Sequence, residues 1–172
     1  MTERDMTLGR DYQQFADNLD GWLLSEKLED VRAYWDGAQA WTRGGNIIRL
    51  PERIRAELPQ GVALDGGIFC GRGNFYEART AVLHGHWTPR CQFWCYDAPD
   101  ASGIWSQRMA AAAAIYSRVV EYRTFPGWRE TNAWLAEIQA DRGEGIVARR
   151  DDVAGYERGR TDYLIKIKEF LK

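Results

Sequence analysis

Lysine is scarce in this sequence, and its positions suggest chemistry. The chain of 172 residues contains four lysines and nineteen arginines. Lys27 follows the apolar run 22–24, and Lys166 and Lys168 lie two residues apart near the end of the chain. Arginine stays protonated in proteins, whereas a desolvated lysine can become a neutral amine that attacks a carbonyl or phosphoryl centre. The scarcity therefore predicts one active site built from both ends of the chain.

The elements that must position these lysines belong to a chain of single-domain size. Its 172 residues and 45% hydrophobic content suit one domain over 1–172. Strong helix formers with apolar spacing predict helices over about 104–120 and 128–141. Pro51 suits the first turn of a further short helix. The rest of the chain is expected to form strands and turns.

The remaining segments have the pattern of strands. Asp36-Gly37 predicts a two-residue hairpin turn between strands at 33–35 and 39–42. Other strands are expected in short apolar segments, at 62–64, 68–70, 92–96, 145–148 and 163–167. Strands interspersed with only a few helices indicate an α+β fold with antiparallel sheets flanked by helices.

The charge and hydropathy patterns exclude several classes of protein. The 23 basic and 25 acidic residues nearly balance, which argues against a wholly basic nucleic-acid coat protein but permits a local basic groove. No apolar stretch approaches the roughly 18 residues of a membrane helix, and Met1–Asp5 is too polar for a secretory signal. We therefore expect no membrane partner. The excess of arginine over lysine is typical of a GC-rich bacterial or phage genome.

Three cysteines, Cys70, Cys91 and Cys95, are an odd number without the spacing of a disulfide framework. Unpaired thiols in a reducing, cytoplasmic setting are the expectation. His84 and His86 precede Cys91 and Cys95 and suggest zinc, but the cysteines lack the spacing of a tight CxxC knuckle. Buried thiols and surface histidines are therefore favoured over a zinc site.

Five short motifs follow one another over nearly the whole chain. They lie at 26–46, 64–75, 93–97, 144–149 and 164–168. In order and spacing these segments resemble the motifs of ATP-dependent DNA ligases, most closely the small viral and bacterial members. The resemblance implies a covalent nucleotidyltransferase (adenylation) domain, ATP-grasp-like in fold, with ATP and Mg²⁺ as cofactors.

The resemblance also implies a reaction for the lysines. In this family a lysine amine attacks the α-phosphate of ATP, releases pyrophosphate and forms a lysyl–AMP phosphoramidate. AMP then passes to the 5′-phosphate of a nick, and the adjacent 3′-hydroxyl displaces it. Lys27 would be the nucleophile, and Lys166 and Lys168 would neutralise phosphate charge.

Further roles follow from the same motifs. The other nucleotide-binding residues that they imply are Glu26, Arg32, Tyr96 and Glu144. Tyr96 would stack on adenine, and Glu144 would also hold the Mg²⁺ that the triphosphate needs. Arg43 and Arg72 would contact DNA. The structural alternatives are a core ring for Tyr96, a turn carboxylate for Glu144 and ordinary hairpin charges for the two arginines.

The chain departs from the family pattern within two of the motifs. The family reads Lys-x-Asp-Gly in the first motif, whereas this chain has Glu29 and Asp30. The added methylene of Glu29 shifts its carboxylate by roughly 1 Å, enough to cost about a hundredfold in rate. Asp30 adds a charge in place of a glycine. Gly67 stands where the third motif carries a glutamate that binds the ribose or assists the metal.

Two functional classes fit these residues, so the sequence leaves open whether the chain is an active enzyme. The first is a ligase-like nucleotidyltransferase that forms lysyl–AMP at Lys27 for nick sealing in DNA repair or replication. A capping-type or RNA-ligase activity is a weaker enzyme alternative. The second is a catalytically degenerate ligase fold, a pseudoenzyme that binds DNA, a nucleotide or a partner protein without turnover.

The expected macromolecular partner in both classes is nicked or duplex DNA. The family's ligases continue past the fifth motif into an oligonucleotide-binding (OB) domain that clamps the duplex. No OB domain is expected within 1–172, so such a domain or another protein partner would act in trans.

Overall fold

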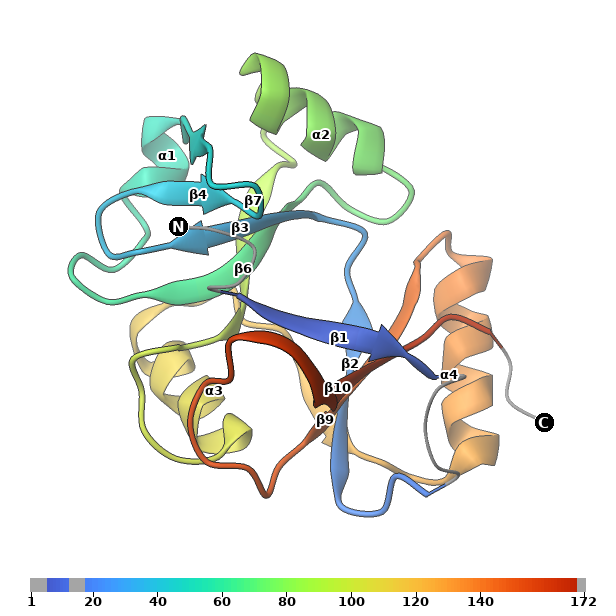
Figure 1. Ribbon diagram of the computed structural model, residues 1–172. Helices are drawn as coiled ribbons and strands as arrows, with labels where there is room; N and C mark the ends of the chain where they lie inside the picture. Colours follow the sequence, from blue (N-terminus) through green and yellow to red (C-terminus); the bar gives the residue numbers. More distant parts are fainter. Residues whose placement is uncertain (1–5, 13–17, 170–172) are drawn as a thin grey trace.

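Two five-stranded sheets form the framework of the protein in a computed structural model, which describes residues 6–12 and 18–169. The first sheet has the order β1-β10-β9-β2-β8, and the second has the order β5-β4-β3-β6-β7. Helix α4 lies beside the first sheet, while α1 and α2 lie beside the second (Figure 1). The polar segment 1–5 lies outside the described residues.

The first sheet joins strands from both ends of the chain. Its strands are β1 (Thr7–Asp11), β10 (Gly159–Ile167), β9 (Gly145–Arg150), β2 (Trp22–Lys27) and β8 (Tyr122–Thr124). The pairs are antiparallel except β1 with β10, which is parallel. Leu135 and Ile138 of α4 (Trp128–Ala140) are buried in one cluster with Leu24, Ile146 and Ile165. This cluster holds the helix against the sheet.

The second sheet is antiparallel throughout. Its strands are β5 (Ile47–Ile48), β4 (Ala40–Thr42), β3 (Val31–Trp35), β6 (Leu64–Phe69) and β7 (Gln92–Asp97). Three helices cover it: α1 (Glu52–Arg55), α2 (Phe75–His84) and α3 (Trp105–Ile115). Each contributes to the main core, through Ile54, Ala78 and Ala112 respectively. The predicted α+β class with mainly antiparallel sheets is confirmed.

The helix predicted over 104–120 is shorter in the structure. It ends at Ile115, because Tyr116 has an extended backbone with φ −144° and ψ 131°. The following segment runs beside β7: Cys95 N–H donates to the carbonyl of Arg118, and Val120 N–H donates to the carbonyl of Cys95. Hydrogen bonds to the edge of the second sheet therefore replace the last helical turn.

Helix α2 was not predicted from the sequence. Its buried positions are the small residues Ala78 and Ala81, whereas the larger Tyr76 and Leu83 are exposed. The apolar period of a helix is consequently weak. Strands β1, β2, β5 and β8 were also missed.

Two turn predictions were wrong in detail. The Asp36-Gly37 hairpin has a four-residue connection, closed by Asp36 N–H to the Gln39 carbonyl, with the Asp36 carboxylate accepting from the amides of Ala38 and Gln39. Residues 65–67 do not separate two strands but continue β6. Gly66 allows the close pairing there, since a β-carbon on it would lie 2.2 Å from the Trp94 carbonyl oxygen.

The prediction of three unpaired thiols was wrong for two of them. Cys70 and Cys91 form a disulfide, and Cys95 is a buried free thiol. Phe69 pairs with Gln92 across β6 and β7, so the next residue pair outward is Cys70 with Cys91. Strand register, which the cysteine spacing does not reveal, brings the two sulfurs together. The disulfide also occupies Cys91, a ligand that the zinc alternative would need.

We expect removal of this disulfide to lower stability measurably. A crosslink between residues 21 apart should contribute roughly 3 kcal/mol. Cys70→Ala/Cys91→Ala should therefore lower the melting temperature by roughly 6–12 °C. Thermal unfolding with and without dithiothreitol measures the effect. Wild type and Cys95→Ala should both shift with the reductant, and the double variant should not; a wild-type melting temperature indifferent to the reductant would contradict this.

Candidate active site

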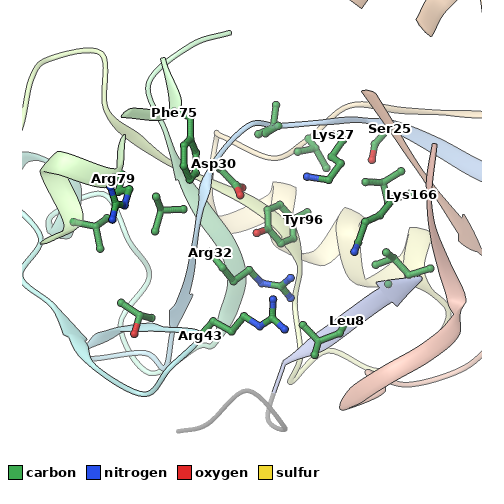
Figure 2. A pocket seen from close by; sticks show the side chains of 18 of the residues that line it. Leu8, Ser25, Lys27, Asp30, Arg32, Arg43, Phe75, Arg79, Tyr96 and Lys166 are labelled. Carbon is green, nitrogen blue, oxygen red and sulfur yellow. The ribbon is translucent and has the colours of Figure 1, made fainter. Parts of the chain in front are cut away.

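A cavity of about 760 Å³ lies between the two sheets. Residues 28–30 border it where the chain passes from β2 of the first sheet to β3 of the second. Figure 2 shows side chains from both sheets directed into it. Its charged lining is mainly basic and consists of Glu26, Lys27, Asp30, Arg32, Arg43, Arg79, Arg149, Arg160, Lys166 and Lys168. Such a cavity suits a polyanionic ligand.

Within the described residues, no helix has the length and apolar character to cross a membrane.

Lys27 and Lys168 share one carboxylate. Lys27 ends β2 and pairs with Gly145, the first residue of β9, so Glu144 lies beside it. The Glu144 carboxylate accepts hydrogen bonds from Lys27 Nζ and from Lys168 Nζ, the latter at 2.7 Å. Burial alone would raise the pKa of Glu144, but these two hydrogen bonds outweigh it and lower the pKa. The carboxylate therefore stays ionised and fixes the direction of the Lys27 amine.

Lys166 brings the third lysine to the same cavity. It lies on β10 opposite Val147, and its Nζ is 3.8 Å from Asp11 Oδ1. Burial lowers the pKa of Lys166, and the neighbouring charges of Lys27 and Lys168 lower it further. Figure 2 shows Lys27 and Lys166 pointing into the same space. The expected convergence of lysines from both ends of the chain is present.

Arg32 and Tyr96 form the opposite wall. Arg32 donates from Nε and Nη2 to the buried Asp65 carboxylate at 2.8 and 2.5 Å, and from Nη2 to the Thr7 carbonyl at 2.9 Å. Its guanidinium carbon lies 5.0 Å from the centre of the Tyr96 ring. The Tyr96 hydroxyl donates to the Gly66 carbonyl at 2.5 Å. Both side chains are thus held rigidly at the cavity wall.

Two predicted contact residues bind each other. Arg72 donates to both oxygens of Glu26 at 2.8 Å, and to Asp141 Oδ2, just after α4, at 2.7 Å. Glu26 lines the cavity, whereas Arg72 lines a neighbouring groove. Arg43 is exposed at the cavity wall. The DNA contacts of both arginines stay predictions.

Several cavity residues were not singled out from the sequence. Arg79 was missed because helix α2 was missed. Phe75, the last residue of the recognised segment 64–75, lies four residues before Arg79 on the same helix face. Arg149 lay within a recognised motif. So did Asp65, which is not a lining residue but anchors the cavity residue Arg32 and also accepts from the Tyr156 hydroxyl at 2.7 Å. Its position inside the third motif was the available signal.

The departures from the family pattern occupy distinct places. Glu29 is not among the described residues that line the cavity, whereas Asp30 is. Among the described residues other than glycine, only Arg142 has a positive φ, so Asp30 replaces a glycine without backbone strain. Gly67 is buried on β6 opposite Arg32.

Comparison with known proteins places this site in context. No family model matches the sequence. Over 159 residues the chain is 31% identical to a DNA ligase of Haemophilus influenzae, in a match that covers 87% of this chain and 59% of that protein. The chain thus spans less than two thirds of that relative.

Solved structures agree on the fold. One from a study of DNA binding by Lig E DNA ligases has a TM-score of 0.84 and 26% identity, and the match covers 96% of this chain and 68% of that one. The Chlorella virus DNA ligase-adenylate has a TM-score of 0.78 at 18% identity, covering 95% and 68%. The ligase domain of M. tuberculosis LigD has a TM-score of 0.68 at 19% identity, covering 95% and 59%.

Proposed function

We propose that this chain, which is similar in sequence and fold to small ATP-dependent DNA ligases, is an adenylation-type domain that binds ATP between its two sheets and accepts AMP on Lys27. The Lys27 amine attacks the α-phosphorus, a nitrogen–phosphorus bond forms, and the bond to pyrophosphate breaks as the amine loses a proton. One observation carries the proposal: three of the four lysines of an arginine-rich chain line one cavity.

The remaining residues have positioning and electrostatic roles in this proposal. Glu144 orients the Lys27 amine through their hydrogen bond. Lys166 and Lys168 line the same cavity and would stabilise charge that develops on the departing pyrophosphate. Tyr96 would face the adenine ring, and Arg32, already held by Asp65, would contact the nucleotide.

The donor set also fits a magnesium ion. Carboxylate oxygens are hard ligands, and Mg²⁺ commonly takes one or two carboxylates together with substrate phosphates. Glu144 is a carboxylate of this kind, held next to the cavity residues Lys27 and Lys168 by its contacts with their amines. When bound, the ion would neutralise charge on the triphosphate, and Glu144 is the residue to hold it.

Nick sealing is the proposed use of the activated AMP, with nicked DNA as substrate. A binding module without turnover is the second candidate, since Glu29 lies outside the cavity lining and Gly67 offers no side chain.

The Cys70–Cys91 disulfide favours an oxidising compartment for the protein. The odd number of cysteines had instead led us to expect the cytoplasm.

Covalent labelling tests the proposal. The chain is incubated with ATP and Mg²⁺ or Mn²⁺ and separated by denaturing electrophoresis. ATP labelled at the α-phosphate should label the 19.8 kDa band, and ATP labelled at the γ-phosphate should not, because that phosphate leaves with pyrophosphate. Transfer of the label to a nicked duplex would extend the result to ligation. Nucleotide binding without any covalent label would favour the second candidate.

A further inference from the structure

The space that a side chain at position 67 would fill is taken by another residue. A β-carbon built on Gly67 would lie 2.0 Å from Asp30 Oδ2 and 2.4 Å from Asp30 Cγ. No left-handed φ is found at Gly67, so its backbone would accept a side chain. The carboxylate of Asp30 therefore occupies the space of a side chain at position 67, so two of the three departures from the family pattern, Asp30 and Gly67, belong together.

Asp30 enters the cavity among charged groups that already have close partners. Lys27 is hydrogen-bonded to Glu144, and Arg32 donates twice to Asp65. Burial raises the pKa of Asp30 to about 6, although Lys27, Arg32 and the Tyr96 hydroxyl each lower it. Ionising a buried carboxylate costs free energy unless a cation is paired with it. Asp30 therefore contributes little to the stability of the fold. Its position is better explained by a ligand.

The connectivity of ATP identifies the part of the ligand that Asp30 would meet. In the proposed function Tyr96 faces adenine and Lys27 attacks the α-phosphate. The ribose joins these two parts, and Figure 2 shows Asp30 beside both Lys27 and Tyr96. A carboxylate is an acceptor for the ribose hydroxyls.

We infer that Asp30 accepts a hydrogen bond from the ribose 2′-hydroxyl, replacing from the β2–β3 connection the carboxylate that a side chain at position 67 would supply from β6. This inference rests on the proposed function. It makes Asp30 a specificity-determining residue that distinguishes ATP from 2′-deoxy-ATP. When 2′-deoxy-ATP is bound, the Asp30 carboxylate has no 2′-hydroxyl from which to accept a hydrogen bond. The deoxynucleotide should therefore bind more weakly than ATP.

Nucleotide affinity, measured by calorimetry, tests the inference without requiring turnover. Wild type should bind ATP roughly 10- to 100-fold more tightly than 2′-deoxy-ATP, the range of a hydrogen bond to a charged group. Asp30→Gly removes the acceptor, so it should weaken ATP binding and bring the ratio near unity, whereas Asp30→Asn keeps an uncharged amide oxygen and should lower the ratio only in part. An unchanged ratio in Asp30→Gly would overturn the inference while leaving the proposed function intact. Absence of ATP binding by wild type would overturn both.

A reciprocal exchange supplies the sharper test. Gly67→Glu alone should lose nucleotide binding, because its side chain meets the Asp30 carboxylate in the same space. Asp30→Gly/Gly67→Glu removes that clash and returns a carboxylate to the cavity, so it should recover the preference for ATP. A double variant no better than Gly67→Glu would contradict the exchange. Thermal unfolding shows whether each variant is folded. If Gly67→Glu does not fold, the ATP to 2′-deoxy-ATP ratio of Asp30→Gly decides the inference.

The pH dependence gives a signature that a merely structural role would not produce. The titratable and charged groups that face Asp30 are Lys27, Arg32, Tyr96 and Glu144. The pKa of Glu144 is lowered and that of Tyr96 is raised well above 10, so neither titrates near pH 6. The ATP preference should therefore rise from pH 5 to pH 7 as Asp30 ionises, and stay flat in Asp30→Asn. A flat wild-type profile would count against the role.

Discussion

Lys27→Arg is expected to abolish covalent labelling of the chain by α-labelled ATP. Arginine keeps the positive charge and can still bind Glu144, but it does not deprotonate and so provides no nucleophile. Loss of a nucleophile lowers rates by at least about a thousandfold, which removes the labelled band on any practical timescale. Denaturing electrophoresis measures the loss of the labelled band. This loss is the largest effect on activity that we expect.

A matched lysine-to-arginine change separates nucleophile from charge. Lys168 also donates to Glu144, and its side chain is 47% exposed. Lys168→Arg preserves the cation, so labelling should survive at a reduced rate, and calorimetry should show that both variants still bind ATP. Labelling of Lys27→Arg at the wild-type rate would place the AMP on another residue and refute the assignment.

The motif order was sufficient to predict the convergence of the lysines. Lys27 ends a strand next to Glu144, and Lys166 lies on the strand beyond, because β9 pairs with both β2 and β10. The proposed reaction needs a lysine, because arginine does not supply a nucleophilic amine. The residue type is therefore visible in the sequence itself. The α+β class was predictable for a similar reason, since hydrophobic period and turn residues are local properties.

The contacts that sequence reasoning missed depend on register and close packing. Cys70 meets Cys91 only because β6 and β7 pair as they do, and Asp30 meets Gly67 only because the β2–β3 connection passes over β6. Read separately, Asp30 and Gly67 are two losses from the family pattern. In the structure the Asp30 carboxylate occupies the space that a side chain at position 67 would fill. Restoring the family's glutamate alone, as Gly67→Glu, would therefore create a clash with Asp30.

The second large effect concerns the buried support of the cavity wall. Asp97 is buried and accepts from Arg108 Nε at 2.7 Å, from Arg108 Nη2 at 3.0 Å and from Arg149 Nη1 at 3.2 Å. Both arginines are also buried, 4% and 7% exposed. Burial lowers the pKa of Arg149, while Asp97 opposes that effect. Without Asp97, two buried cations would lose the carboxylate that compensates them.

Asp97→Ala should therefore destabilise the fold by about 3–5 kcal/mol, the usual cost of breaking a buried ion pair. Urea denaturation measures the change as a lower midpoint. Asp152→Ala is the matched control: its carboxylate also binds an arginine through two hydrogen bonds, but its side chain is 63% exposed, so a much smaller change in the urea midpoint is expected. Equal costs for the two variants would contradict the assignment. Since Arg149 also lines the cavity, Asp97→Ala should weaken ATP binding as well, which links the stability of this buried network to the proposed site.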